Sequence, residues 1–516
     1  MLVQDFLKNS AERFPDKTAL VCGEQRYTYA NMLEQSSRLA GAFRAMGLRR
    51  QDRVVIFCEN SVESVVSLFA TIMAGGIFVM LNPAMKAKKL AYILNNSGTR
   101  AIVAQTAKAP VVRDALAAAP EVRHVVWVGP LKADTCPPAA GAVAHHWAQL
   151  LVDDSQVPAS LGASGIDVDL ATIIYTSGST GDPKGVMSAH CNMVAAARSI
   201  TTYLENTPAD IILNTLPLSF DYGLYQLLMA FMFGGTLVLE PSFAFPYRIL
   251  ERLVREKVTG FPIVPTMVAL LLQMQDLSRF DFSSLRYITN TAAALPVPHV
   301  RRLIELFPAA RIYSMYGLTE CKRVAYMPFE KLAERPGSVG IPMPNCEVFV
   351  VDEEGREVGP NQVGELVIRG ANVMQGYWRS PEETARRFRP GKYRGDVLLY
   401  SGDLFRRDAE GFLYFVGRRD DMIKTKGERV SPKEIENVIC ELKGVAEAAV
   451  IGVPDDILGQ AVKAFLVLSD GTALSEKDVL NHCKKHLEPF LVPKHIEFRD
   501  TLPRTASGKI DKKPLR

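Results

Sequence analysis

The feature that most constrains this chain is a run of glycine and hydroxyl residues directly after an apolar strand. Residues 173–186 read Ile-Ile-Tyr-Thr-Ser-Gly-Ser-Thr-Gly-Asp-Pro-Lys-Gly-Val. Glycines let backbone N–H groups converge on an anion, hydroxyls add donors, and the lysine adds a positive charge. The order is not GxxxxGK[ST], so the pattern predicts a phosphate-binding loop of another kind. The candidate phosphate-binding residues are Thr176, Ser177, Gly178, Ser179, Thr180, Gly181 and Lys184.

The surrounding sequence predicts an α/β fold. Residues 29–46 and 65–74 have helical patterns, and residues 53–58 form a β-branched run between them. Strands that alternate with helices indicate a largely parallel sheet covered by helices. From about residue 340 to residue 414, short apolar runs are separated by glycines, which is typical of antiparallel strands or a small barrel. After residue 417, a helix, two strands and a second helix predict a small α+β domain.

Composition excludes several classes of function. The chain has 60 basic and 56 acidic residues, an excess too small to suggest a nucleic-acid partner. The most apolar stretch, residues 65–81, is too short and too interrupted for a membrane span, and residues 1–8 contain no signal-peptide core. Eight cysteines without a CxxC pair suggest neither a zinc site nor a disulfide framework, so we expect reduced thiols and a cytoplasmic location.

Four later segments carry further candidate chemistry. Residues 313–320 read Tyr-Ser-Met-Tyr-Gly-Leu-Thr-Glu, and residues 400–404 read Tyr-Ser-Gly-Asp-Leu. Residues 417–432 form a charged stretch, Gly-Arg-Arg-Asp-Asp-Met-Ile-Lys-Thr-Lys-Gly-Glu-Arg-Val-Ser-Pro, and residues 503–511 read Pro-Arg-Thr-Ala-Ser-Gly-Lys-Ile-Asp. An aromatic face suits a purine, and a hard carboxylate oxygen suits a metal ion that bridges phosphates. Taken singly, each segment could be an ordinary turn or a solvated charge run.

Together, and in this order, the motifs resemble the adenylate-forming superfamily of acyl-CoA synthetases, luciferases and peptide-synthetase adenylation domains. The resemblance covers essentially the whole chain. It implies an ATP-dependent ligase that activates a carboxylic acid as its acyl-AMP and uses Mg2+. It also implies a large N-terminal domain, residues 1–417, with layered α/β sheets and a small β-barrel subdomain. A small, mobile α+β domain, residues 418–516, would rotate about a hinge at Asp420 between the two half-reactions.

The resemblance also implies roles for individual residues. Tyr316 would stack on adenine, Asp403 and Arg418 would contact the ribose, and Glu320 would hold the magnesium ion. The implied catalytic residues are Lys509, Glu320, Thr319 and Lys184, with Thr319 on the α-phosphate and Lys509 between the reacting anions. In relatives, the face that contains Lys424 and Gly427 turns toward the acceptor in the second half-reaction.

The acyl pocket is expected to be apolar, because its three candidate segments, residues 216–224, 261–266 and 289–295, are mostly apolar. Its candidate residues are Phe220, Asp221, Tyr222, Thr291, Ala292 and Ala294. Asp221 either binds a polar group of the substrate or caps a helix. Cys321-Lys322-Arg323 is an unusual sequence after Glu320, and we expect it to add positive charge at the mouth of the site, where it could hold the carboxylate of an acceptor.

The acceptor remains open. The chain is most similar to stand-alone ligases that couple a bicyclic carboxylic acid to an amino acid such as isoleucine as an amide. An acid–CoA ligase that forms a thioester is the alternative. A non-catalytic acyl-AMP-binding protein is disfavoured because Lys184, Glu320, Asp403 and Lys509 are all present.

Overall fold

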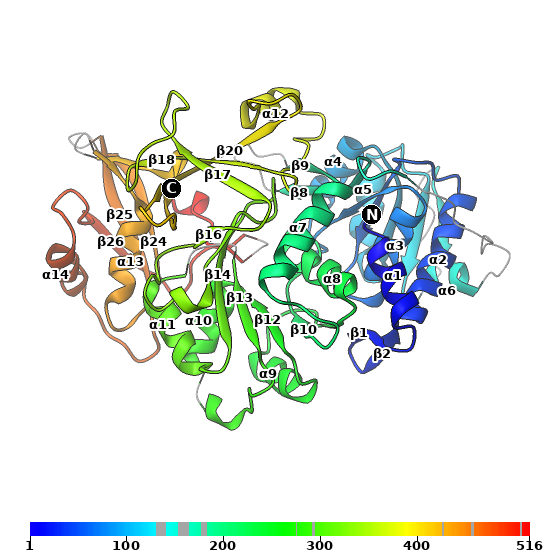
Figure 1. The fold of residues 1–516 in the computed structure, drawn as a ribbon, viewed down its shortest axis with the longest axis horizontal. Helices are drawn as coiled ribbons and strands as arrows, with labels where there is room; N and C mark the ends of the chain where they lie inside the picture. The colour runs from blue at the N-terminus through cyan, green and yellow to red at the C-terminus, as the bar shows by residue number, and fades with distance from the viewer. Residues whose placement is uncertain are drawn as a thin grey trace.

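The computed structural model describes residues 1–130, 141–152, 165–176, 183–274, 276–291, 295–425, 428–455, 459–505 and 508–516. Within these ranges the strands form two large and two small sheets (Figure 1). The mixed α/β class predicted from the alternation of strands and helices is confirmed, with a large N-terminal part and a small C-terminal part. No helix in the described ranges is long and apolar enough to cross a membrane. The cysteines there are free thiols.

The seven-stranded sheet leads to the phosphate loop. Its order is β7 (Val143–His146), β6 (His124–Val128), β5 (Thr99–Gln105), β3 (Arg53–Phe57), β4 (Ile77–Met80), β8 (Leu170–Thr176) and β9 (Lys184–Ala189). All neighbouring pairs are parallel except β8 and β9, which are antiparallel with Thr176 opposite Lys184. The expected phosphate loop therefore joins two adjacent antiparallel strands.

The nine-stranded sheet carries the second cluster of motifs. Its order is β16 (Ile341–Pro342), β15 (Ala325–Tyr326), β14 (Arg311–Tyr316), β13 (Tyr287–Asn290), β12 (Gly260–Ile263), β10 (Ile211–Asn214), β11 (Thr236–Leu239), β1 (Thr18–Cys22) and β2 (Gln25–Thr28). Six neighbouring strands of this sheet run parallel to one another: β14, β13, β12, β10, β11 and β1. Tyr316 thus ends a parallel strand at the carboxyl edge, where α/β sheets commonly bind ligands.

Helices cover both large sheets. They are α1 (Asp5–Arg13), α2 (Tyr29–Ala45), α3 (Val62–Met73), α4 (Ala87–Ser97), α5 (Ala109–Leu116), α6 (Trp147–Val152), α7 (His190–Tyr203), α8 (Asp221–Phe233), α9 (Pro246–Arg255), α10 (Pro265–Gln273) and α11 (Val297–Leu306). Successive residues of β3 face opposite cores: Val54 and Ile56 join one core, and Val55 and Phe57 join the other. This alternation is expected for a strand covered by helices on both faces.

The glycine-punctuated region forms an antiparallel sheet, as expected. Its order is β17 (Cys346–Val351), β18 (Val363–Gly370), β20 (Val397–Arg407) and β19 (Phe388–Pro390), and β21 (Leu413–Arg418) pairs with β20. Helix α12 (Pro381–Arg387) leads into β19. In the register of β20 and β21, Asp403 lies directly opposite Arg418.

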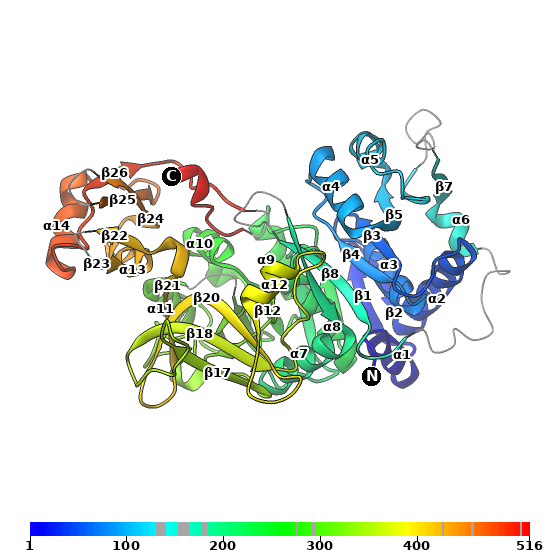
Figure 2. The same ribbon diagram turned by 90° about the horizontal axis from the view of Figure 1, so that it is seen from above.

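The C-terminal part has its own sheet and its own cores. Strands β23 (Glu428–Val430), β22 (Ile423–Thr425), β25 (Gly459–Leu468), β24 (Val445–Asp455) and β26 (His495–Phe498) form the sheet, with helices α13 (Pro432–Glu441) and α14 (Glu476–His486). Two apolar clusters of the described residues lie entirely within it. In Figure 2 the red C-terminal tail leaves this sheet and extends toward the centre of the molecule.

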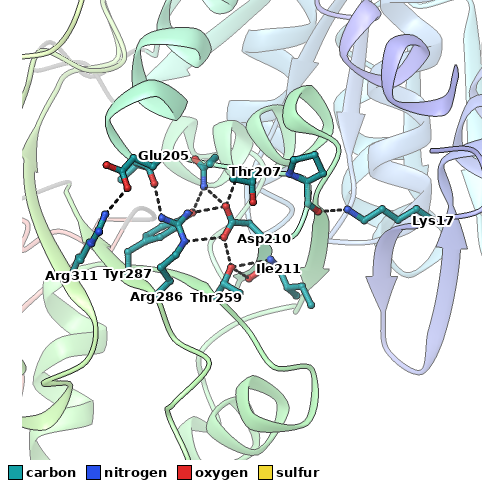
Figure 3. A network of polar contacts seen from close by, with 12 residues as sticks. Lys17, Glu205, Thr207, Asp210, Ile211, Thr259, Arg286, Tyr287 and Arg311 are labelled. Carbon is teal, nitrogen blue, oxygen red and sulfur yellow. Dashed lines mark hydrogen bonds and ion pairs between the residues drawn. The ribbon is translucent and has the colours of Figure 1, made fainter. Parts of the chain in front are cut away.

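A polar network fixes the amino ends of four strands in the nine-stranded sheet (Figure 3). Asp210, 3% exposed, precedes β10; its carboxylate accepts hydrogen bonds from Arg286 at 2.8 and 3.1 Å and from the Thr259 hydroxyl at 2.8 Å. Burial alone would raise the pKa of Asp210, but these donors and the Thr207 N–H lower it overall. Nearby, Arg311 of β14 pairs with the exposed Glu205. The network lies at the edge opposite the carboxyl ends.

We expect Asp210→Asn to lower the free energy of unfolding by about 2–4 kcal/mol, because it weakens a buried, multiply bonded ion pair. A lowered pKa means that the stabilisation is complete at neutral pH and is lost only as the pH falls through the folded-state pKa. Thermal melting at pH 6, 7 and 8 should therefore show the same loss at each pH. Glu205→Gln, in the exposed pair with Arg311, is the control and should change stability by about 0.5 kcal/mol or less. Equal losses for both variants would contradict this assignment.

Candidate active site

The segment that follows strand β14 is partly accessible to solvent. Residues 316–320, the Tyr-Gly-Leu-Thr-Glu motif, are all only partly buried, although the four residues before them in the strand are buried. Gly317 is required here because a Cβ atom at this position would lie 2.2 Å from the carbonyl oxygen of Lys322. The motif therefore packs against the turn that follows it, while Tyr316, Thr319 and Glu320 stay partly exposed.

Tyr316 is joined to the motif at residues 400–404. Its hydroxyl donates to Asp403 Oδ2 at 2.6 Å. Arg418 Nε lies 3.4 Å from the other carboxylate oxygen, Oδ1, which has no hydrogen-bond partner within the described ranges. Burial raises the pKa of Asp403, while Arg418 and the Tyr316 hydroxyl oppose that shift. The structure thus brings together Tyr316, Asp403 and Arg418, which are separated in the sequence, and leaves Asp403 with acceptor capacity for hydroxyl groups.

Two phenylalanines that the sequence did not single out orient Tyr316. The Phe405 ring packs edge-on against it with centroids 4.8 Å apart, and the Phe415 ring lies nearly parallel at 6.4 Å. Phe405 follows Asp403 by two residues on β20, and Phe415 precedes Arg418 by three on β21. Their positions in alternating strands near the motifs are the only sequence signal that could have indicated them.

Lys184 and Glu320 lie on either side of Tyr377, another residue that the sequence did not indicate. The Tyr377 hydroxyl donates to Glu320 Oε1 at 2.5 Å. Lys184 Nζ lies 5.9 Å from the Tyr377 ring centroid and forms an ion pair with Glu383 of α12 at 2.7 Å. The bond from Lys184 lowers the pKa of Glu383. Tyr377 reaches this place because it bridges Val186 of β9, the strand that begins at Lys184.

The C-terminal tail brings Lys509 near the same group of residues. A Cβ atom at Gly508 would lie 3.4 Å from Thr266 Oγ1, so the tail rests against a candidate segment of the acyl pocket. The Lys509 side chain is accessible to solvent, yet desolvation by the surrounding protein lowers its pKa. The carboxylates of Asp221, Asp403 and Glu320 oppose that shift, with Asp221 the strongest of the three. Residues that are far apart in the sequence therefore share one electrostatic environment.

The candidate acyl-pocket residues gather around the start of α8. Phe220 is the N-cap residue and Asp221 is the first helical residue, so the expectation that Asp221 caps the helix is wrong. An acidic residue in this first turn is still favoured by the helix dipole. The buried Tyr222 hydroxyl lies 2.7 Å from Thr289 Oγ1 and donates to the Thr289 carbonyl at 2.8 Å, which ties α8 to β13. Thr291 is buried next to this strand.

The prediction that Lys322 and Arg323 add positive charge at the mouth of the site is wrong. Lys322 is 3% exposed and Arg323 is 1% exposed, so both side chains lie in the interior. Neither can serve as an open surface site for the carboxylate of an acceptor. The prediction failed because charged residues in a loop are usually solvated, and the sequence gives no signal that this turn folds inward.

Several candidate residues lie outside the described residues. They are Ser177, Gly178, Ser179, Thr180, Gly181, Ala292, Ala294 and Gly427. Thr176 and Lys184, which flank the phosphate loop, are described at the ends of β8 and β9. Asp420 lies in a short 3-10 turn, Arg419–Asp421, and Lys424 lies in β22, but the side chains of both are outside the description.

The arrangement suits a nucleotide and a second anion. It offers an aromatic ring, a carboxylate for hydroxyls, a lysine next to a glycine-rich loop and a second lysine from the tail. The carboxylate of Glu320 is the kind of hard oxygen ligand that Mg2+ accepts, and magnesium usually uses one or two protein carboxylates together with phosphates and water. No cluster of three or more metal-ligating side chains occurs in the described ranges.

Comparisons with known proteins give a consistent result. A model of the AMP-binding enzyme family matches residues 7–378, and a model of the AMP-binding enzyme C-terminal domain matches residues 434–509. A long-chain-fatty-acid–CoA ligase from Bacillus subtilis (strain 168) is 31% identical over 99% of this chain and 94% of its own length.

Solved structures show the same relationship. An anthranilate CoA ligase in complex with anthranoyl-AMP superposes with a TM-score of 0.91 at 27% identity, covering 100% of this chain and 96% of that one. An amide bond synthetase from Marinactinospora thermotolerans superposes with a TM-score of 0.89 at 27% identity, covering 100% of this chain and 99% of that one. The chain therefore belongs to the AMP-binding enzyme family of adenylate-forming ligases, which use ATP to activate a carboxylic acid as its adenylate.

Proposed function

We propose that this ligase activates a largely apolar cyclic or aliphatic acid and then joins it to the amino group of an amino acid such as isoleucine, as coronafacate ligase does. The observation that carries the proposal is the convergence of Lys509 with Asp221, Asp403 and Glu320 at the cleft beside Tyr316. The amide acceptor is supported by the resemblance of the sequence to coronafacate ligase and by the similarity to an amide bond synthetase.

In this proposal the cleft residues position ATP. Tyr316 stacks on adenine, held at its edge by Phe405, and Asp403 Oδ1 accepts from the ribose hydroxyls next to Arg418. Thr319 contacts the α-phosphate. The loop of residues 176–181 and Lys184 hold the β- and γ-phosphates, and Lys184 then exchanges its partner Glu383 for phosphate oxygens.

Magnesium would be held by Glu320, whose orientation is fixed by the hydrogen bond from Tyr377. When bound, the ion supplies charge neutralisation on the phosphate oxygens. Glu320 lies in the segment that follows β14, and Tyr377 is anchored along β9, so this carboxylate is held between the two large sheets. The protein therefore fixes the position of the ligand before nucleotide and metal arrive.

The first half-reaction is an in-line displacement. An oxygen of the substrate carboxylate forms a bond to the α-phosphorus, and the bond from that phosphorus to the bridging oxygen of pyrophosphate breaks. Two anions approach each other in this step, so positive charge near the reacting oxygens lowers the barrier. Lys509 supplies that charge from the tail, and Lys184 stabilises the leaving pyrophosphate.

In the second half-reaction the acceptor amine attacks the acyl carbonyl carbon. The carbon–oxygen bond to AMP breaks, AMP leaves, and the amine loses a proton to solvent. Because Lys509 occupies the cleft in the first step, the C-terminal domain, residues 418–516, must move before an acceptor can enter. We place the hinge at Asp420, between β21 and β22, and expect the face with Lys424 and Gly427 to turn toward the acceptor.

A second candidate function is an acid–CoA ligase that forms an acyl-CoA thioester. The similarity to a long-chain-fatty-acid–CoA ligase and to an anthranilate CoA ligase favours it. Both candidates share the adenylation step and differ only in the nucleophile.

We expect Lys509→Ala to slow acid-dependent exchange of labelled pyrophosphate into ATP by roughly 100-fold or more, because one preorganised charge at the reacting oxygens is lost. Lys485→Ala removes a lysine from the last turn of α14 and is the matched control, with exchange close to that of the parent. Exchange by Lys509→Ala at the parental rate, with a true substrate present, would remove the basis of the mechanism.

The acceptor is tested by measuring AMP release from ATP and an accepted acid with either isoleucine or CoA as the nucleophile. We expect AMP release to rise with isoleucine, and mass spectrometry of the product to show the acid joined to isoleucine with loss of water. Stimulation by CoA alone, with the mass of an acyl-CoA, would replace the amide assignment by the thioester alternative. Adenylation itself would stand in either case.

A further inference from the structure

The turn between β14 and β15 has an unusual backbone. Lys322 has φ of 65°, in the left-handed region, and the N–H of Arg323 donates to the carbonyl of Cys321 at 2.8 Å. A hydrogen bond across one residue with positive φ is a γ-turn of the rare, strained kind. The Asn372 side chain holds it by donating to the carbonyls of Cys321 and Arg323, both at 2.9 Å. Strained backbone that is held in this way clusters at functional sites.

The turn directs Lys322 into the interior beside α8. Its ammonium donates to the Asp221 carbonyl at 2.8 Å and lies 3.9 Å from Asp221 Oδ2. It also lies 4.6 Å from the ring centroid of Tyr225 and 5.3 Å from that of Tyr222. The ammonium is thus enclosed by two aromatic faces and the first turn of the helix.

Arg323 is buried beside it and is incompletely bonded. Its guanidinium carbon lies 5.5 Å from the Tyr222 ring centroid, and its positive charge opposes the rise that burial causes in the pKa of Tyr203. Its Nε and Nη1 atoms have no hydrogen-bond partner among the described residues, and neither has the buried hydroxyl of Tyr225. Buried donors are almost always bonded, so these three point to an acceptor supplied by another molecule.

The charges of this cluster do not balance. Lys322 lies 3.9 Å from one carboxylate oxygen, that of Asp221, and the neighbouring Arg323 is a second buried basic side chain. Two buried cations therefore face one anion in the described part of the chain. A buried charge without a partner is strongly destabilising, so the cluster favours an additional oxygen-bearing group.

The cluster lies next to the acyl pocket. Asp221 interacts both with Lys322 and with Lys509, the lysine of the tail. Tyr222, which Arg323 approaches, is bonded to Thr289 of β13, at the start of a candidate pocket segment. Asp221, in the first turn of α8, is thus common to the surroundings of Lys322 and Lys509.

We propose that the acid substrate carries, remote from its activated carboxyl group, an oxygen acceptor such as a ring ketone or a second carboxylate, and that Arg323 and Lys322 bind it. This inference rests on the proposed function and narrows its substrate class. An acid whose far end is entirely hydrocarbon would leave the buried donors unpaired and should be a poor substrate. Sites that hydrogen-bond a substrate group discriminate strongly against analogues that lack it.

The test is pyrophosphate exchange with three matched acids: cyclohexanepropanoic acid, its ring-ketone analogue and its ring-carboxylate analogue. We expect kcat/KM for at least one oxygenated acid to exceed that of the hydrocarbon acid by about tenfold or more. Arg323→Met should bring this ratio close to one, mainly through KM for the oxygenated acid. The ketone and carboxylate arms identify which acceptor binds.

Arg302→Met, which removes an exposed arginine from α11, is the control and should keep the parental ratio. If Arg323→Met does not fold, the same ratio of kcat/KM values is measured for Lys322→Met and compared with the parental ratio. A parental ratio near one, or an unchanged ratio in a folded Arg323→Met, overturns the inference and means that water alone fills the cluster. Failure of every acid to support exchange would instead count against adenylation of this class of acids, so the two failures are distinguishable.

Discussion

The hydrogen bond from Tyr316 to Asp403 is the contact on which the rest of the site depends. It joins the carboxyl end of a parallel strand to the middle of the antiparallel sheet. Asp403 in turn faces Arg418, the last residue of β21. One carboxylate thus connects the segment after β14, the antiparallel sheet and the chain that leads to the C-terminal part.

The site contains several charged side chains, and much of their charge is paired within the protein. Lys184 is held by Glu383, and Tyr377 holds Glu320. Such pairing keeps the side chains in place and avoids charges without a partner. Lys509 is the exception, because it remains accessible while three carboxylates act on it from different elements.

Local patterns predicted the elements well and long-range contacts poorly. The helix expected over residues 29–46 is observed as Tyr29–Ala45, and the strand expected over residues 53–58 is observed as Arg53–Phe57. Motifs placed Tyr316 and Asp403 because each lies in a recognisable segment. Tyr377 and Glu383 were missed because their partners lie 57 and 199 residues away in the chain. The inward turn at Lys322 was missed because it depends on Asn372, which belongs to a distant loop.

The central claim is that the acid attacks the α-phosphorus of ATP, and the fate of the carboxylate oxygens tests it most directly. An accepted acid labelled with oxygen-18 in both carboxyl oxygens is turned over completely with ATP and the acceptor, and the phosphorus products are analysed by mass spectrometry. The mechanism predicts one labelled oxygen in AMP and none in pyrophosphate. Unlabelled AMP, or label in inorganic phosphate together with ADP, would show attack at a different phosphorus and would contradict it.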